Sequence, residues 1–69
     1  MKFRVELEKE VDGRWIGEVR SLRGALAYGR TRAEALAAVQ ALALRMLADR
    51  LEHGEAAAGP VSVSFATAR

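Results

Sequence analysis

The chain has 69 residues, of which 51% are hydrophobic and 29% charged, and its formal net charge is +2. This balance is typical of a small globular protein, so we expect one domain spanning residues 1–69. With no cysteine and one histidine, disulfides, thiol chemistry and zinc knuckles are excluded. No apolar run approaches the roughly 20 residues of a membrane span, and no signal-peptide core is visible. We therefore expect a cytoplasmic protein without a membrane partner.

The first predicted element is a strand in which Phe3, Val5 and Leu7 alternate with charged residues. This period of two is typical of a strand with one buried face. The pair Asp12-Gly13 follows. Asp-Gly between two alternating runs predicts a hairpin, because glycine takes the positive φ that a primed turn requires.

Two more strands are expected before any helix. Residues 15–20 form the second, with Trp15, Gly17 and Val19 on one face and Ile16, Glu18 and Arg20 on the other. Residues 25–28 can form a third strand, although their alanines have weak β propensity.

A long helix is predicted from about Arg32 to His53. Thr31 and Glu34 have the spacing of a capping box, which marks the helix start. Gly54 is a natural left-handed C-terminal cap. At 1.5 Å per residue such a helix reaches roughly 33 Å, so part of it should overhang a sheet of short strands.

The apolar residues of this helix cover an arc of roughly 200°, whereas packing on one sheet needs about half of that. We predict that the face near Leu36, Ala43 and Leu47 packs on the sheet. A second contact surface would then use Leu42 and Met46, or Leu44 and Leu51. The competing interpretation is that leucine and alanine are simply good helix formers. A 69-residue domain has a small core, which also favours a homo-oligomer, either a dimer or a tetramer.

Residues 55–59 form an alanine-rich linker, and Pro60 cannot continue a helix. The following run, Val61–Phe65, predicts a last strand whose buried face is Val61, Val63 and Phe65. Because a crossover through a helix produces a right-handed parallel pairing, this strand should lie parallel to the first. The expected fold is α+β, with an antiparallel three-stranded meander, one helix and a fourth strand returning beside strand one.

Four arginines and no acid lie between Val19 and Ala33, namely Arg20, Arg23, Arg30 and Arg32. They could form a nucleic-acid-binding surface, with Tyr28 or Trp15 as a stacking platform. The alternatives are solvated loop arginines, and core or interface packing of the two aromatic rings.

Catalytic and metal-binding interpretations are weak. Glu6, Glu8 and Glu10 alternate along the first strand like a carboxylate set for a metal, but a solvated strand face explains them as well. His53 lies in the last helical turn, where its ring can interact favourably with the negative end of the helix dipole rather than act as a proton acceptor. The glycines match neither a phosphate loop nor a dinucleotide fingerprint. We expect no enzyme activity, no catalytic or metal-binding residue and no cofactor.

The segment from Asp12 to Leu36 supports a family resemblance. The strand with Phe3, Val5 and Leu7 is followed by the motifs Asp12-Gly13 with Trp15, Leu22 with Gly24, Gly29 with Thr31, and Glu34-Ala35-Leu36. This order and spacing resemble the HicB-like antitoxin family over roughly residues 3–54. That family commonly has prolines flanking the leucine of the central loop, where this chain has Arg20 and Arg23.

The resemblance implies a cut-down ribonuclease H fold and a non-enzymatic domain. Its partner would be a small HicA-like toxin that cleaves messenger RNA, neutralised by direct binding. A ribonuclease H enzyme would also need an acid near the end of the fourth strand, which this chain lacks. HicB-like antitoxins usually carry a C-terminal DNA-binding segment, and we expect none after the fourth strand. An orphan homo-oligomer is the remaining alternative. The candidate partner-binding residues are Tyr28, Arg30, Leu42 and Met46.

Overall fold

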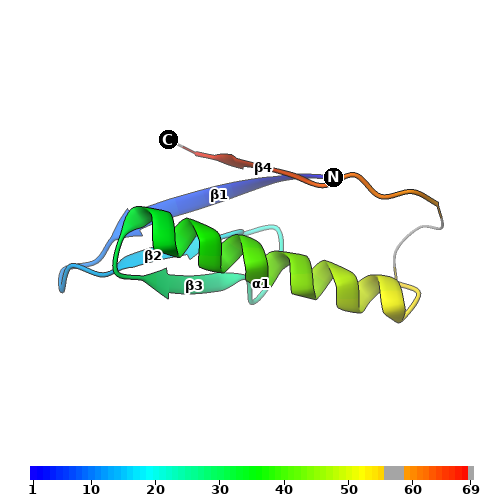
Figure 1. The fold of residues 1–69 in the computed structure, drawn as a ribbon, viewed down its shortest axis with the longest axis horizontal. Coiled ribbons are helices and arrows are strands. Elements are labelled where there is room, and N and C mark those ends of the chain that lie inside the picture. Colours follow the sequence, from blue (N-terminus) through cyan, green and yellow to red (C-terminus); the bar gives the residue numbers. More distant parts are fainter. Residues whose placement is uncertain (56–58, 69) are drawn as a thin grey trace.

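The computed structural model describes residues 1–55 and 59–68. Its elements follow the order β-β-β-α-β, which confirms the predicted α+β fold. They are β1 (Lys2–Lys9), β2 (Trp15–Glu18), β3 (Leu26–Gly29), α1 (Arg32–Glu52) and β4 (Ser64–Thr67) (Figure 1). Strands β2 and β3 are only four residues long, and the last turns of α1 extend beyond them.

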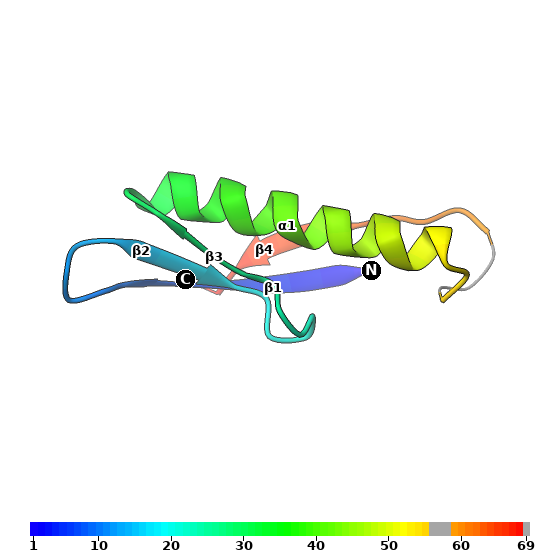
Figure 2. The same ribbon diagram turned by 90° about the horizontal axis from the view of Figure 1, so that it is seen from below.

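The strands form one sheet in the order β3-β2-β1-β4. The β1–β2 and β2–β3 pairs are antiparallel, whereas β4 lies parallel to β1, as the sequence predicts. Figure 2 shows two layers, with α1 on one face of the sheet. In residues 1–55 and 59–68, no second helix covers the opposite face. We refer to that opposite face as the outer face.

The first hairpin has a longer loop than the predicted primed turn. The N–H of Glu10 donates to the carbonyl of Arg14 at 2.6 Å, and the N–H of Gly13 donates to the carbonyl of Glu10 at 3.0 Å. Three residues therefore form the loop, which is the pattern of a turn followed by a left-handed residue. Gly13 is that residue, with a φ of +93°, so the expected positive φ is confirmed.

Both predicted helix caps are present. The Thr31 side chain accepts a hydrogen bond from the N–H of Glu34, and the Glu34 carboxylate accepts one from the N–H of Arg30. At the other end of the helix, the N–H of Gly54 donates to the carbonyl of Leu51, and the N–H of Glu55 donates to the carbonyl of Arg50. Gly54 has a φ of +69°, which completes a Schellman cap and ends the helix one residue earlier than predicted.

The core lies between α1 and the inner face of the sheet. Its buried residues are Val5, Val19, Leu22, Ala25, Val39, Ala43 and Leu47. Leu22 is only 3% exposed, because the loop between β2 and β3 folds its side chain inward. Ala43 and Leu47 pack on the sheet as predicted, but Leu36 is only half-buried, and Ala35 and Val39 occupy the centre of the contact.

Glycines in the sheet explain why small helix residues are central. A Cβ atom at Gly17 would lie 3.0 Å from Val39 Cγ1 and 3.1 Å from the carbonyl oxygen of Ala35. At Gly29 it would lie 2.4 Å from the backbone nitrogen of Ala35. The first half of α1 therefore approaches the β2 and β3 backbones closely, and small residues fill the narrow space.

The last strand begins later than predicted. It spans Ser64–Thr67 rather than Val61–Phe65, and Val61 is 41% exposed. In the observed register Ser64 pairs with Lys2, the first residue of β1, and ahead of this pair the N-terminal ammonium of Met1 donates to the carbonyl of Ser62. Val63 and Phe65 still pack on the core, and the Phe65 ring lies 5.7 Å from that of Phe3. The centre of the predicted linker, residues 56–58, lies outside the described residues.

Replacing Gly29 with alanine should destabilise the fold by about 2 kcal/mol and lower the melting temperature by roughly 8–16 °C. The new Cβ would collide with backbone atoms of α1, which cannot move without displacing the helix. Thermal unfolding followed by circular dichroism measures the effect. The comparison variant is Gly17→Ala, whose tightest contact is a side-chain methyl and whose loss should be smaller. A Gly29→Ala protein as stable as the parent would contradict this account.

Candidate functional site

The outer face of the sheet carries an exposed apolar patch, which we define as Ile16, Leu26 and Tyr28. Ile16 pairs directly with Tyr28, and the next pair on the same face of the sheet is Glu18 with Leu26. Leu26 and Tyr28 are 41% and 45% exposed, and Ile16 is half-buried. Neighbouring strands thus place three apolar side chains side by side on the face that α1 leaves open.

Arg14 completes one side of this patch. Its guanidinium carbon lies 4.6 Å from the centroid of the Tyr28 ring, within the range of a cation–π interaction. The same guanidinium binds Asp12, with Nε 2.8 Å from Oδ2. Sequence reasoning missed Arg14. The signal in the sequence was the position of Arg14, one residue before the strand that pairs with the Tyr28 strand.

The other side of the patch is charged. Arg20 lies 3.1 Å from the carboxylate of Glu6 and 3.7 Å from that of Glu18. These ion pairs are exposed and contribute little to stability, but they neutralise one of the four clustered arginines.

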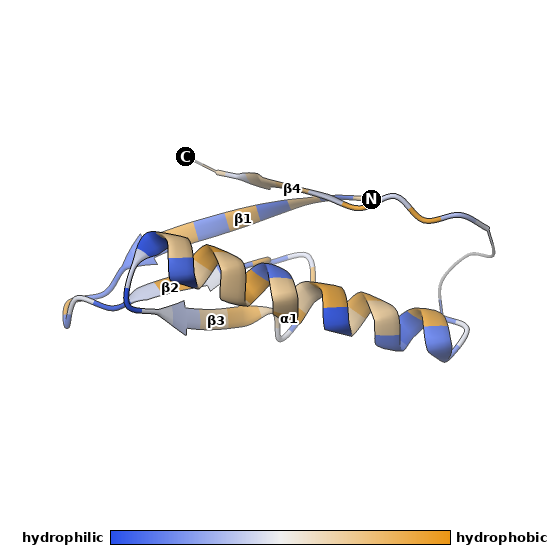
Figure 3. Cartoon of the chain, in the orientation of Figure 1, coloured by the Kyte–Doolittle hydropathy of each residue, from blue (hydrophilic) through white to orange (hydrophobic). Residues whose placement is uncertain are grey.

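The four predicted partner-binding residues do not form one surface. Tyr28 is on the outer face of β3, whereas Leu42 and Met46 belong to α1 on the other face of the sheet. Leu42 is half-buried, and Met46 is half-buried against the core, so the sheet does accommodate much of it. Arg30 is exposed between β3 and α1. The exposed large apolar residues of α1 are instead Leu44 at 48% and Leu51 at 43%. Figure 3 shows that apolar and polar bands alternate along this helix.

The arginines are likewise divided. Arg20 and Arg23 lie in the loop that enters β3, and Arg30 and Arg32 follow its other end. A four-residue strand separates the two pairs, a span of roughly 13 Å. The basic cluster of the sequence is therefore not one continuous basic surface in the fold.

The residues considered for metal binding or catalysis are Glu6, Glu8, Glu10 and His53. Among the described residues, no three His, Cys, Asp or Glu side chains come together in a way that could hold a metal ion. His53 Nδ1 lies 2.7 Å from the backbone oxygen of Asp49 in the last turn of α1. In the part of the chain that the structure describes, no helix combines the length and hydropathy needed to cross a bilayer.

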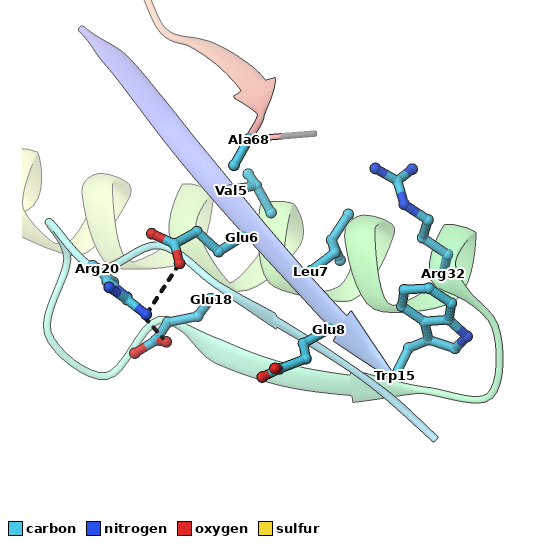
Figure 4. A pocket seen from close by; sticks show the side chains of 9 residues that line it. All are labelled: Val5, Glu6, Leu7, Glu8, Trp15, Glu18, Arg20, Arg32 and Ala68. Carbon is cyan, nitrogen blue, oxygen red and sulfur yellow. Dashed lines mark ion pairs between the residues drawn. The ribbon is translucent and has the colours of Figure 1, made fainter. Parts of the chain in front are cut away.

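A groove of about 530 Å³ runs along β1 where β4 ends (Figure 4). Val5, Leu7 and Trp15 line one side of it, and Glu6, Glu8 and Glu18 line the other. The strand alternation produces this division, because successive side chains of β1 point to opposite faces of the sheet. The sequence pattern alone did not predict this groove.

Comparisons with protein-family models, with curated proteins and with solved structures found no match to this chain. The HicB-like resemblance therefore stays a prediction.

The pKa of Asp12 provides a test of the hairpin geometry. A hydrogen bond from the backbone N–H of Arg14 is the largest cause that lowers this pKa below 3.8, and the Arg14 side chain lowers it further. In Arg14→Ala the backbone N–H remains, so the pKa should rise only part of the way toward 3.8. Carboxyl ¹³C NMR titration of both proteins measures it.

The sign of the pH effect follows from this shift. A lowered pKa means that the ionised carboxylate stabilises the folded hairpin, a contribution present above pH 3.8 and lost as the pH falls through the folded-state pKa. An Asp12 pKa in Arg14→Ala equal to that of the unfolded chain would show that the backbone hydrogen bond has no such role.

Proposed function

We propose that this chain is a non-enzymatic, cytoplasmic protein-interaction domain that binds its partner through the outer face of the sheet. The observation that carries the proposal is the exposed apolar patch of Ile16, Leu26 and Tyr28 on a face with no covering element among the described residues. Contiguous apolar surface of this kind is typical of protein-binding sites in small domains.

The composition of the patch supports a protein partner. Tyrosine and arginine are enriched among the residues that contribute most to binding energy, and here Arg14 holds the Tyr28 ring at 4.6 Å. The patch is bordered by charged side chains from Glu18 and Arg20. An apolar centre with a polar rim is the usual arrangement of a protein interface.

The resemblance to HicB-like antitoxins supplies the partner class. We propose a HicA-like toxin that cleaves messenger RNA, held inactive by direct burial of its active surface. The support is the observed order of elements, with β4 parallel to β1, which is the arrangement that the resemblance implies. Fold alone does not establish function, so a partner must be captured directly.

Nucleic-acid binding is the weaker alternative. It depended on a continuous surface of Arg20, Arg23, Arg30 and Arg32, whereas the fold divides these residues between the two ends of β3. Arg20 is also neutralised by two glutamates. The carboxylates near the groove would further repel a phosphate backbone.

Self-association would use a different surface. Leu44 and Leu51 are seven residues apart on α1, so they lie on the same side of the helix, and both are more than two-fifths exposed. We propose that this side of α1, where the helix extends past the short strands, forms the contact of a dimer or a tetramer.

Capture from a lysate of the source organism, with the tagged protein as bait, tests the partner. We expect recovery of one small nuclease-like protein in near-equal amount. Tyr28→Ala should weaken its binding about 30-fold, because removing a central aromatic residue costs roughly 2 kcal/mol. The control is Val11→Ala, which changes an exposed apolar residue at the hairpin tip. Undiminished binding by Tyr28→Ala would exclude the patch as the binding site.

Sedimentation equilibrium tests self-association. The parent protein should sediment as a dimer or tetramer, and the double variant Leu44→Gln, Leu51→Gln should shift toward monomer, because it removes apolar contact without disturbing the core. Ala41→Gln changes another exposed position of α1 and serves as the control. A parent protein that stays monomeric at high concentration would overturn this part of the proposal.

A further inference from the structure

Strand β1 has an edge that is only half occupied. Strand β4 pairs with its first part, from Lys2 to Val5, and β2 pairs with its second part, from Glu6 to Lys9. The backbone N–H of Ala68 donates to the carbonyl of Val5 at 2.9 Å. Beyond Ala68, the described residues provide no strand for this edge. We refer to residues 6–9 on this side as the open edge.

The hydrogen-bonding groups of the open edge can be assigned from the ladder. The backbone N–H of Glu10 donates to the carbonyl of Arg14, on the β2 side of β1. The carbonyl of Val5 accepts from the N–H of Ala68, on the β4 side. Because the two sides alternate along a strand, the N–H and C=O groups of Leu7 and Lys9 point toward the open edge. An extended segment placed there could pair with both residues.

The side chains flanking the open edge are of two kinds, as Figure 4 shows. Leu7 and Trp15 lie on the inner side, together with Val5, and form an apolar stretch of the groove wall, which Arg32 borders beside Trp15. Glu6, Glu8 and Glu18 lie on the outer side. Arg20 neutralises part of that charge, but Glu8 has no ion-pair partner among the described residues.

A second copy of the chain cannot pair symmetrically at this edge without a penalty. A two-fold antiparallel pairing through Leu7 and Lys9 sets odd residues opposite odd and even opposite even. The even residues are Glu6, Glu8 and Glu10, so in each register a glutamate faces a glutamate. Like charges directly opposite are destabilising, and charged edges are a common protection against self-pairing.

We propose that the open edge of β1 is a strand-addition site for an extended segment of the partner protein in which basic and apolar residues alternate. The segment would pair its backbone with Leu7 and Lys9, place basic side chains against Glu6 and Glu8, and place apolar side chains toward Leu7 and Trp15. Main-chain pairing supplies affinity in this mode of recognition, and the flanking side chains supply specificity. This inference rests on the proposed function and names the part of the partner that is recognised.

A synthetic peptide with alternating lysine and valine is the direct probe, added to the full chain and followed by NMR. We expect saturable shifts and slowed hydrogen exchange at the amides of Leu7 and Lys9, with affinity falling as salt rises. Glu8→Gln should weaken binding about fivefold and Glu8→Lys at least about tenfold. Glu52→Lys makes the same charge change at the end of α1 and should have no effect.

Two control peptides test specificity. An alternating glutamate and valine peptide should not bind, and a central proline in the lysine peptide should abolish binding because it removes a backbone donor. Peptide binding that is insensitive to Glu8→Lys, or that protects β3 amides rather than Leu7 and Lys9, would overturn the proposal.

The outcomes separate this inference from the proposed function. If a captured toxin binds Glu8→Lys and the parent equally, but is lost with Tyr28→Ala, the partner proposal stands and the strand-addition site is wrong. If the lysine peptide binds at the open edge but no toxin is captured, the site stands and the HicA-like partner is wrong. Filaments formed by the protein alone would contradict the strand-addition proposal. Head-to-tail pairing of the open edge with β3 of another copy produces such filaments, and a second copy would then occupy the site.

Discussion

The close contact between α1 and two glycine positions of the sheet is the constraint on which the rest of the structure depends. Gly17 and Gly29 leave no space for a side chain beneath Ala35 and Val39. The helix can therefore lie against the backbones of β2 and β3, and the buried apolar side chains of residues 1–55 and 59–68 lie on or near this interface. One helix and one sheet face thus form the two layers that enclose this core.

Because α1 covers one face of the sheet, the outer face stays exposed in the part of the chain that the structure describes. The two antiparallel registers then bring Ile16 next to Tyr28 and Glu6 next to Glu18. Arg14 and Arg20 flank the resulting surface from two different loops, one binding an aromatic ring and the other two carboxylates. The features that support a protein partner are thus consequences of strand pairing rather than of any single motif.

The staggered pairing of β1 divides this strand into two halves with different neighbours. Its first half is central in the sheet and packs Phe3 against Phe65, whereas its second half has one partner strand among the described residues. The alternation that buries Val5 also places Glu6 and Glu8 on the opposite face, so one pattern produces both the core and the acidic wall of the groove.

Local signals in the sequence determined the order and type of the elements. The alternation of Phe3, Val5 and Leu7, the capping pair Thr31 and Glu34, and Gly54 each act within a few residues, so the strand, the helix start and the helix end were predictable. Tertiary structure alone decided which surfaces these elements share. The β4 register, the stacking of Arg14 on Tyr28, the separation of the arginines and the open edge all depend on contacts between residues distant in sequence, and no local pattern encodes such distances.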